Sequence, residues 1–113
     1  MLPKKLRLSG REIKKTLKEK PVERGEYFNL RYLLNNKKIS RFGVIISHLV
    51  LKKAVERNHL KRQILEIIAA SLSKIKTGYD IIIVPLKSVE KLKFHQLNLL
   101  LLEQLKINNL LNE

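Results

Sequence analysis

The sequence predicts a small α+β protein, a two-layer α/β sandwich with the element order α-β-β-(β)-α-β-α. Three observations lead to this prediction: long segments with helical spacing of apolar residues, segments in which apolar and polar residues alternate, and an almost wholly apolar run at 79–84. The chain has 113 residues and 44% of them are hydrophobic, which is enough for one modest core. We therefore expect a single domain over 1–113.

Residues 9–20 are predicted to form the first helix. Ser9 can cap it, and Glu12 stands three positions later, as in a capping box. Ile13 and Leu17 are four positions apart and so share one helix face. Pro21 is expected to end this helix.

The next two segments are predicted to pair as a hairpin. Residues 26–34 alternate between apolar and polar side chains, as in a half-buried strand, with room for a further strand where the segment bends. A polar turn at 35–38 separates it from a second predicted strand at 41–47. The apolar face of the first strand is expected to carry Phe28, Leu30 and Tyr32.

The second half of the chain predicts two helices around one buried strand. The helix at 52–76 has a core-facing stripe, and Gly78 is expected to close it. The strand at 79–84 is expected to be central, and the Leu-rich helix at 88–108 to cover the sheet. Any pairing of strands across the first of these helices requires a crossover connection. The stripe consists of Leu60, Ile64, Ile67, Ile68 and Leu72, and the covering residues of the last helix are Leu97, Leu100, Leu101 and Leu105.

Positive charge is concentrated in the first part of the chain. Of the 24 Lys and Arg residues, 18 lie in the first 62 positions against five carboxylates, so this part carries a net charge of +13. The remaining 51 residues carry +1. A field of one sign attracts polyanions and speeds their binding, which indicates a nucleic-acid partner.

The residues that usually build active sites and metal sites are scarce. The chain has no Cys, Asp80 is its only Asp and is interpreted as a turn residue, and His48, His59 and His95 are far apart. We expect no catalytic residues, no metal site and no cofactor bound by the protein alone. The longest apolar runs are far shorter than a membrane span, and no secretory signal is visible, so we expect a cytoplasmic protein without a membrane partner.

The long helix carries a ladder of cations. Lys53, Arg57 and Lys61 recur every four residues, and Asn58 and Arg62 form the neighbouring stripe. Helix neighbours of this kind are about 6 Å apart, close to the spacing of successive phosphates. A solvated basic face is the alternative, but the ladder coincides with the basic part of the chain, which favours contact with nucleic acid.

A second candidate surface lies between the first helix and the predicted hairpin. Its apolar floor would consist of Ile13, Leu17, Phe28 and Tyr32, and aromatic rings there could stack on the bases of a single strand. Burial of Phe28 or Tyr32 in the core is the alternative interpretation. The basic edge of this surface would be Lys14, Lys18 and Arg31.

These residues resemble the protein component of bacterial ribonuclease P. The segment 53–62, Lys-Ala-Val-Glu-Arg-Asn-His-Leu-Lys-Arg, is similar to the family signature Arg-Asn-Arg, an apolar residue and Lys-Arg. The flanking segments 41–47 and 78–83 resemble the strands on either side of the signature helix. Further agreement is found at Leu6-Arg7-Leu8, Glu12-Ile13 and Arg24-Gly25.

The resemblance implies a left-handed βαβ crossover and an auxiliary role in an RNA enzyme. In that family the RNA subunit uses Mg²⁺ to remove the 5′ leader of precursor tRNA, and the protein binds both the catalytic RNA and the leader, with no DNA partner. By this resemblance, Arg57, Asn58, Lys61 and Arg62 would face the catalytic RNA, and we add Lys53 and His59 from the same basic segment. The resemblance places Ile13, Leu17, Phe28 and Arg31 in the leader-binding cleft, and we add Tyr32 from the apolar face of the strand.

The sequence departs from the family pattern at several positions. His48-Leu49 stands where two Lys residues are usual, and His59 replaces the second Arg of the signature. Leu65 occupies a usually basic position, and Ile13 replaces a Phe. If each lost cation removes one phosphate contact, RNA affinity should be weaker and less dependent on salt than in a typical member.

Three other functions remain open from the residues alone. A ribosomal protein or general RNA chaperone shares the size and basicity of this chain. A sequence-specific DNA-binding protein is disfavoured because the basic helix follows a strand rather than a short helix-turn-helix. A protein-only nuclease is disfavoured because no carboxylate cluster could hold its metal ions.

Overall fold

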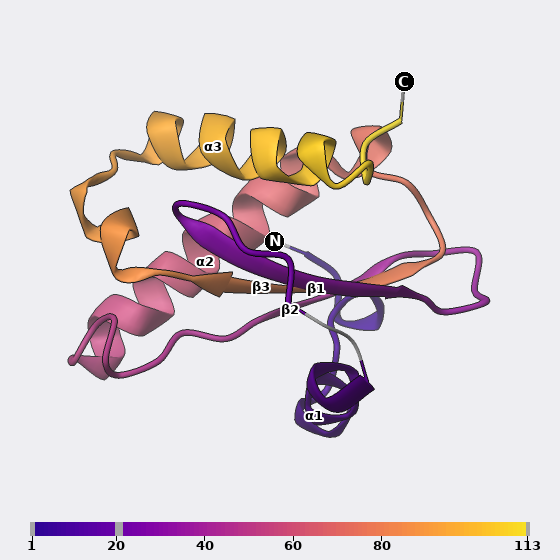
Figure 1. Cartoon of the computed structure of the whole chain (residues 1–113), viewed down its shortest axis with the longest axis horizontal. Helices are drawn as coiled ribbons and strands as arrows, with labels where there is room; N and C mark the ends of the chain where they lie inside the picture. Colours follow the sequence, from indigo (N-terminus) through magenta and orange to yellow (C-terminus); the bar gives the residue numbers. More distant parts are fainter. Residues whose placement is uncertain (1, 20–21, 113) are drawn as a thin grey trace.

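The computed structural model describes residues 2–19 and 22–112. Within this part, the chain forms three α-helices, three strands and three short 3₁₀ helices (Figure 1). The elements, in order, are η1 (Lys4–Leu6), α1 (Gly10–Glu19), β1 (Phe28–Leu34), β2 (Arg41–Val44), α2 (Ala54–Ala70), η2 (Leu72–Lys74), β3 (Tyr79–Pro85), η3 (Lys87–Lys91) and α3 (Phe94–Ile107).

The strands form one mixed sheet in the order β1-β3-β2. β3 is antiparallel to β1, with Ile83 opposite Leu30, and parallel to β2, with Ile83 opposite Val44. The predicted hairpin of the first two strands is therefore wrong, because β3 lies between them. The prediction of a central β3 is confirmed, and β1 runs without interruption rather than dividing into two strands.

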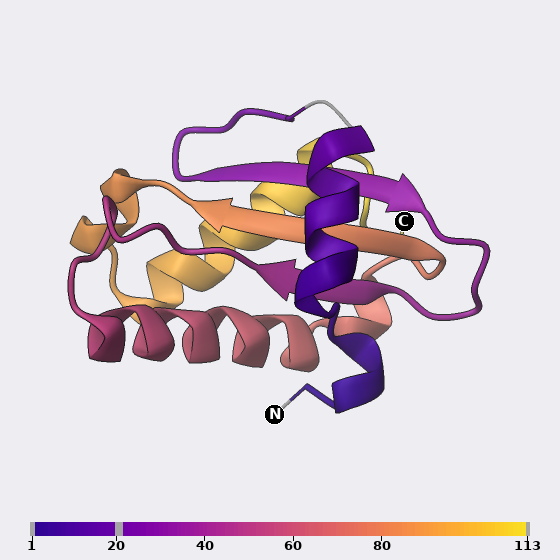
Figure 2. The ribbon, with the colours of Figure 1, turned by 90° about the horizontal axis from the view of Figure 1, so that it is seen from below.

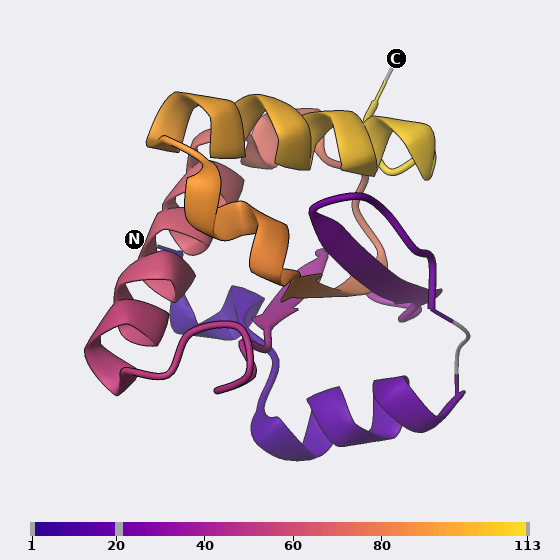
Figure 3. The ribbon, with the colours of Figure 1, turned by 60° about the vertical axis from the view of Figure 1, so that its left-hand side comes forward.

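The helices cover the two faces of the sheet unequally. Figures 1 and 3 show α2 and α3 together on one face and α1 alone on the other. The sheet with α2 and α3 forms the expected two-layer sandwich, and α1 adds a partial cover to the opposite face. The connection from β2 through α2 to the parallel strand β3 is left-handed, as Figures 1 and 2 show together.

The main core lies between the sheet and the pair α2 and α3. The predicted stripe of α2 is confirmed at Leu60, Ile64, Ile67 and Ile68, which are buried, whereas Leu72 is half-buried beyond the helix end. The predicted cover from α3 is confirmed at Leu97, Leu101 and Leu105, with Leu100 half-buried. The sheet contributes Phe28, Leu30, Phe42, Val44, Ile81 and Ile83 to the same cluster.

Local sequence signals predicted one helix end correctly and two incorrectly. The capping box of α1 is confirmed, because the Ser9 N–H donates to Glu12 Oε1 at 2.9 Å and the Glu12 N–H donates to Ser9 Oγ at 3.2 Å. α2 ends at Ala70, earlier than predicted, and Gly78 (φ +88°) instead serves the turn that enters β3. α3 begins at Phe94 because residues 87–91 form η3. No helix in the described ranges is both long enough and apolar enough to cross a membrane.

The core packing predicts different costs for two leucines of the same helix. Leu101 is completely buried, so Leu101→Ala should lower the free energy of unfolding by about 2–5 kcal/mol through lost burial and a residual cavity. Leu99 is 65% exposed, and Leu99→Ala should change it by less than about 0.5 kcal/mol. Urea titrations of both variants measure the difference, and equal costs would contradict the assignment of the α3 faces.

Candidate RNA-binding surfaces

The first half of α2 presents most of the predicted RNA-facing residues to solvent. Lys53 is the N-cap residue of the helix, and its side chain is exposed. Asn58, His59, Lys61 and Arg62 are exposed along the following two turns. Asn58, His59 and Arg62 project away from the buried residues Ile64 and Ile68, whereas Lys61 lies at the margin of the buried face, beside Leu65.

Arg57 differs from the rest of the ladder. Its side chain is half-buried, and its Nη1 donates hydrogen bonds of 2.8 Å to the carbonyl oxygens of Leu51 and Lys52. The guanidinium therefore holds the loop that precedes α2, where Lys52 and Lys53 lie. Only part of its donor capacity is left for a phosphate, so Arg57 also positions neighbouring cations.

The sheet separates the residues predicted to share a leader cleft. Residues paired across strands point to the same face, and Arg31 is paired with Ile82, which in turn is paired with Gly43. Ile13 of α1 lies against this row, since a Cβ on Gly43 would be 2.8 Å from its Cδ1. Arg31 Nη1 donates to the carbonyl of Leu17. The structure thus brings together Ile13, Leu17 and Arg31 on the α1 face.

Phe28 and Tyr32 lie on the opposite face, so their predicted place beside Ile13 is wrong. Phe28 is 1% exposed and belongs to the core under α3. The Tyr32 hydroxyl donates to Asn108 Oδ1 at 3.4 Å, and its ring meets Tyr79 edge to face with centroids 6.3 Å apart. Burial raises the pKa of Tyr32. Alternation identified which residues share a face but not which helix covers that face.

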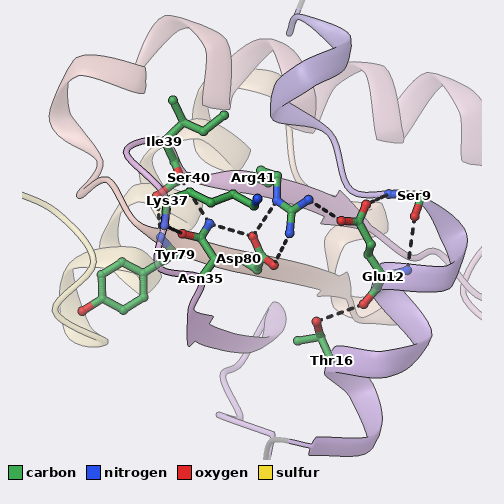
Figure 4. Close-up of polar contacts among 10 residues, drawn as sticks. All are labelled: Ser9, Glu12, Thr16, Asn35, Lys37, Ile39, Ser40, Arg41, Tyr79 and Asp80. Atoms are coloured by element: carbon green, nitrogen blue, oxygen red, sulfur yellow. Dashed lines mark hydrogen bonds and ion pairs between the residues drawn. The ribbon is translucent and has the colours of Figure 1, made fainter.

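A network of charged groups joins α1 to the sheet (Figure 4). Asp80 is 5% exposed and accepts hydrogen bonds from Arg41 Nε at 3.0 Å and Arg41 Nη2 at 2.8 Å. The remaining Nη1 of Arg41 forms an ion pair with Glu12 of α1. Asn35 Nδ2 donates to Asp80 at 2.8 Å, and Thr16 Oγ1 donates to the Glu12 carbonyl at 3.0 Å. Asp80 is therefore a buried hydrogen-bond acceptor for Arg41 and Asn35 rather than the predicted turn residue.

The same contacts fix the charges of the network. The hydrogen bonds that Arg41 donates to Asp80 raise the pKa of Arg41 above its usual range. Hydrogen bonds from the Ser9 backbone and hydroxyl, with a smaller contribution from Arg41, lower the pKa of Glu12. Both groups stay ionised and paired. We call Glu12, Arg41 and Asp80 the clamp, because they hold α1 against the sheet. Among the described residues, no group of three or more His, Cys, Asp or Glu residues could hold a metal ion.

Sequence reasoning missed this clamp for a specific reason. Arg41 and Asp80 are 39 positions apart and meet only because β2 and β3 are parallel neighbours. The available signal was the single Asp at the start of an otherwise apolar strand, since a buried carboxylate requires a partner.

Comparison with known proteins identifies the family. Residues 2–107 match the sequence model of the family described as Ribonuclease P. This chain belongs to the ribonuclease P protein family. The ribonuclease P protein component of Pseudanabaena sp. (strain PCC 6903) is 34% identical over 99 residues, which are 86% of this chain and 85% of that protein. The corresponding protein of Finegoldia magna is 37% identical over 79 residues, 67% of this chain and 69% of that one.

Solved structures agree with this assignment. The ribonuclease P protein of Thermotoga maritima superposes with a TM-score of 0.80 at 31% identity, covering 88% of this chain and 94% of that one. The Staphylococcus aureus ribonuclease P protein has a TM-score of 0.84 at 24% identity over 95% and 98% of the two chains, and supports the fold alone. The chain is thus of the kind that forms the protein part of ribonuclease P, a tRNA-processing ribonucleoprotein with an RNA partner. A ribosomal or chaperone role is not favoured.

Removing the Arg41 guanidinium should strongly destabilise the folded protein. Arg41→Met leaves the buried carboxylate of Asp80 without its main partner, and should lower the free energy of unfolding by about 3–5 kcal/mol. Arg11→Met, at an exposed position of α1, should change it by less than about 0.5 kcal/mol. Chemical denaturation of both variants tests this, and a cost below about 1 kcal/mol for Arg41→Met would rule out the clamp.

The lowered pKa of Glu12 predicts a pH effect. A carboxyl group whose pKa is lower in the folded state contributes stability above its ordinary value of 4.5, and this is lost as pH falls through the folded pKa. The free energy of unfolding should therefore fall as pH decreases from about 5 to 3, and fall less in Glu12→Gln. Glu103→Gln, at an exposed position of α3, is the matched control. Urea titrations across this pH range measure the free energy of unfolding. Its plot against pH should run parallel for the wild type and Glu103→Gln, and should be less steep for Glu12→Gln.

Proposed function

We propose that the exposed face of α2 binds the catalytic RNA of ribonuclease P and that the α1 face of the sheet binds the 5′ leader of precursor tRNA. The main support for the first part is the exposed group Asn58, Lys61 and Arg62 on a rigid helix. Hydrolysis is assigned to the RNA subunit with Mg²⁺, and the protein contributes binding.

The charges on α2 suit a phosphate backbone. Within the parts of the chain described, no carboxylate forms an ion pair with Lys53, Lys61 or Arg62. An arginine can donate two hydrogen bonds to phosphate oxygens, and a lysine acts as a point charge. Asn58 lies between these cations and can bond a ribose hydroxyl or a base edge. His59, at the usual Arg position, remains exposed beside them.

The α1 face of the sheet suits a single strand. Ile13, Leu17 and Arg31 are half-buried there, and Lys14 and Lys18 are exposed on the same helix. Beyond α1, the sheet continues with the half-buried pair Asn29 and Val84. None of the described residues named on this face is aromatic, so leader binding rests on apolar contact and charge rather than on stacking. Phe28 and Tyr32 are excluded from this surface because they face α3.

The charged carboxylates of the clamp do not suit catalysis by the protein. Glu12 and Asp80 are both committed to Arg41. A general base must be able to take up a proton near neutral pH, and Glu12 has its pKa shifted in the opposite direction. This supports an auxiliary role in which the chemistry belongs to the RNA.

The decisive experiment is cleavage of a precursor tRNA by a cognate ribonuclease P RNA at low Mg²⁺, with and without the protein. We expect strong stimulation and a product cut at the mature 5′ end. Tight RNA binding without stimulation would instead support a chaperone-like role.

In a separate binding experiment, Arg62→Ala should weaken association with the catalytic RNA by about 1–3 kcal/mol, the range for a charge-assisted hydrogen bond. Lys87→Ala, an exposed lysine of η3, removes the same charge elsewhere and should leave affinity nearly unchanged. Filter binding at moderate salt measures both. Equal effects of the two substitutions would show that total charge, not the α2 face, determines affinity.

A further inference from the structure

The segment before α1 is fixed to the edge of the sheet. Leu2, Leu6 and Leu8 are buried, and the Leu8 N–H donates to the Phe42 carbonyl at 2.8 Å. Arg7 forms a parallel bridge with Phe42 of β2, but its side chain is exposed between two buried leucines. The backbone that carries Arg7 is therefore held in place on both sides.

This segment borders a groove that α2 also borders. Figure 2 shows the first residues of the chain near the C-terminal end of α2 before the chain rises into α1, and Arg7 lines a hollow with Lys61 and Leu65 of α2. One hollow of about 340 Å³ extends from Lys4 and Arg7 across Gly43 to Lys61. A second hollow of about 170 Å³ contains Asn58 and Arg62. Arg7, Lys61 and Leu65 line both hollows, so the two are adjacent, and we call them together the Arg7 groove.

The balance of charge in the Arg7 groove favours an anion. Its cations are Lys4, Arg7, Lys61 and Arg62, and its carboxylates are Glu12 and Glu66. Glu12 is already occupied by Arg41 and the Ser9 N–H. No ion pair to Lys4, Arg7, Lys61 or Arg62 exists over residues 2–19 and 22–112. These cations, carried by an anchored segment and a helix, are thus available to phosphates.

We propose that the Arg7 groove holds a stretch of the phosphodiester backbone of the catalytic RNA, with Arg7 and Lys4 adding contacts to those of α2. This inference rests on the proposed role of α2. Backbone rather than bases is the expected occupant because the only aromatic residue of the groove, Phe42, is 1% exposed and offers no stacking face. The groove meets the proposed leader surface at Ile13, but its cations are shared with α2 through Lys61 and Arg62, so the catalytic RNA is the expected occupant.

The test compares Arg7→Ala with wild type in binding to the catalytic RNA alone over a range of salt concentrations. Loss of one phosphate contact should weaken binding roughly tenfold at moderate salt. The slope of log affinity against log salt should become shallower by about 0.7–0.9. Arg7→Lys keeps the charge and should retain most of the slope. Lys74→Ala, an exposed lysine of η2 outside the groove, should bind as wild type.

Each other outcome overturns the inference in a recognisable way. If Arg7→Ala binds normally while Arg62→Ala is weak, the groove is not a contact and the role of α2 stands. If both bind normally, the proposed role of α2 falls as well. If Arg7→Ala leaves affinity for the catalytic RNA unchanged but lowers holoenzyme affinity for precursor tRNA more than for mature tRNA, the groove belongs to the leader. An unchanged unfolding midpoint in Arg7→Ala shows that the fold is intact.

Discussion

Ile81, Ile82 and Ile83 expose none of their surface, because β3 has strands on both edges and helices on both faces. A strand this apolar cannot be placed at a sheet edge without exposing much of it to water. A strand is therefore needed on each edge of β3, and these are β1, which is antiparallel to it, and β2, which is parallel. The parallel neighbour requires a crossover, and α2 provides it. The position of the basic helix thus follows from the parallel pairing of β2 with β3.

The opposite face of the sheet is held by different forces. α1 offers only two apolar side chains to it, Ile13 and Leu17, and both remain half exposed. Its position depends instead on the ion pair of Glu12 with Arg41 and on the buried partner of Arg41, Asp80. Such a pair contributes little beyond a well-packed apolar contact, but breaking one partner is costly. It therefore fixes where α1 lies more than it adds to overall stability, and leaves the rest of this face uncovered.

The elements were predictable because their signals are local. Helical spacing located α2 and α3, and the Ser9-Glu12 capping box located the start of α1. Strand pairing was not predictable in the same way, since a polar turn at 35–38 suits both a hairpin and a wider connection. The outward face of α2 was predicted because a helix fixes its own side-chain directions. Phe28 was misplaced because alternation gives two faces without saying which helix covers each.

The net positive charge affects both the folding of the chain and its binding to RNA. The chain carries a net charge of +14, yet in the described ranges both ion pairs are made by Arg41. Self-repulsion among the remaining cations disfavours the compact state of the isolated protein. An RNA that binds the folded chain neutralises the same charges and stabilises the fold by mass action. Under the proposed role of α2, a cation such as Arg62 would oppose folding in the isolated protein and support it in the ribonucleoprotein.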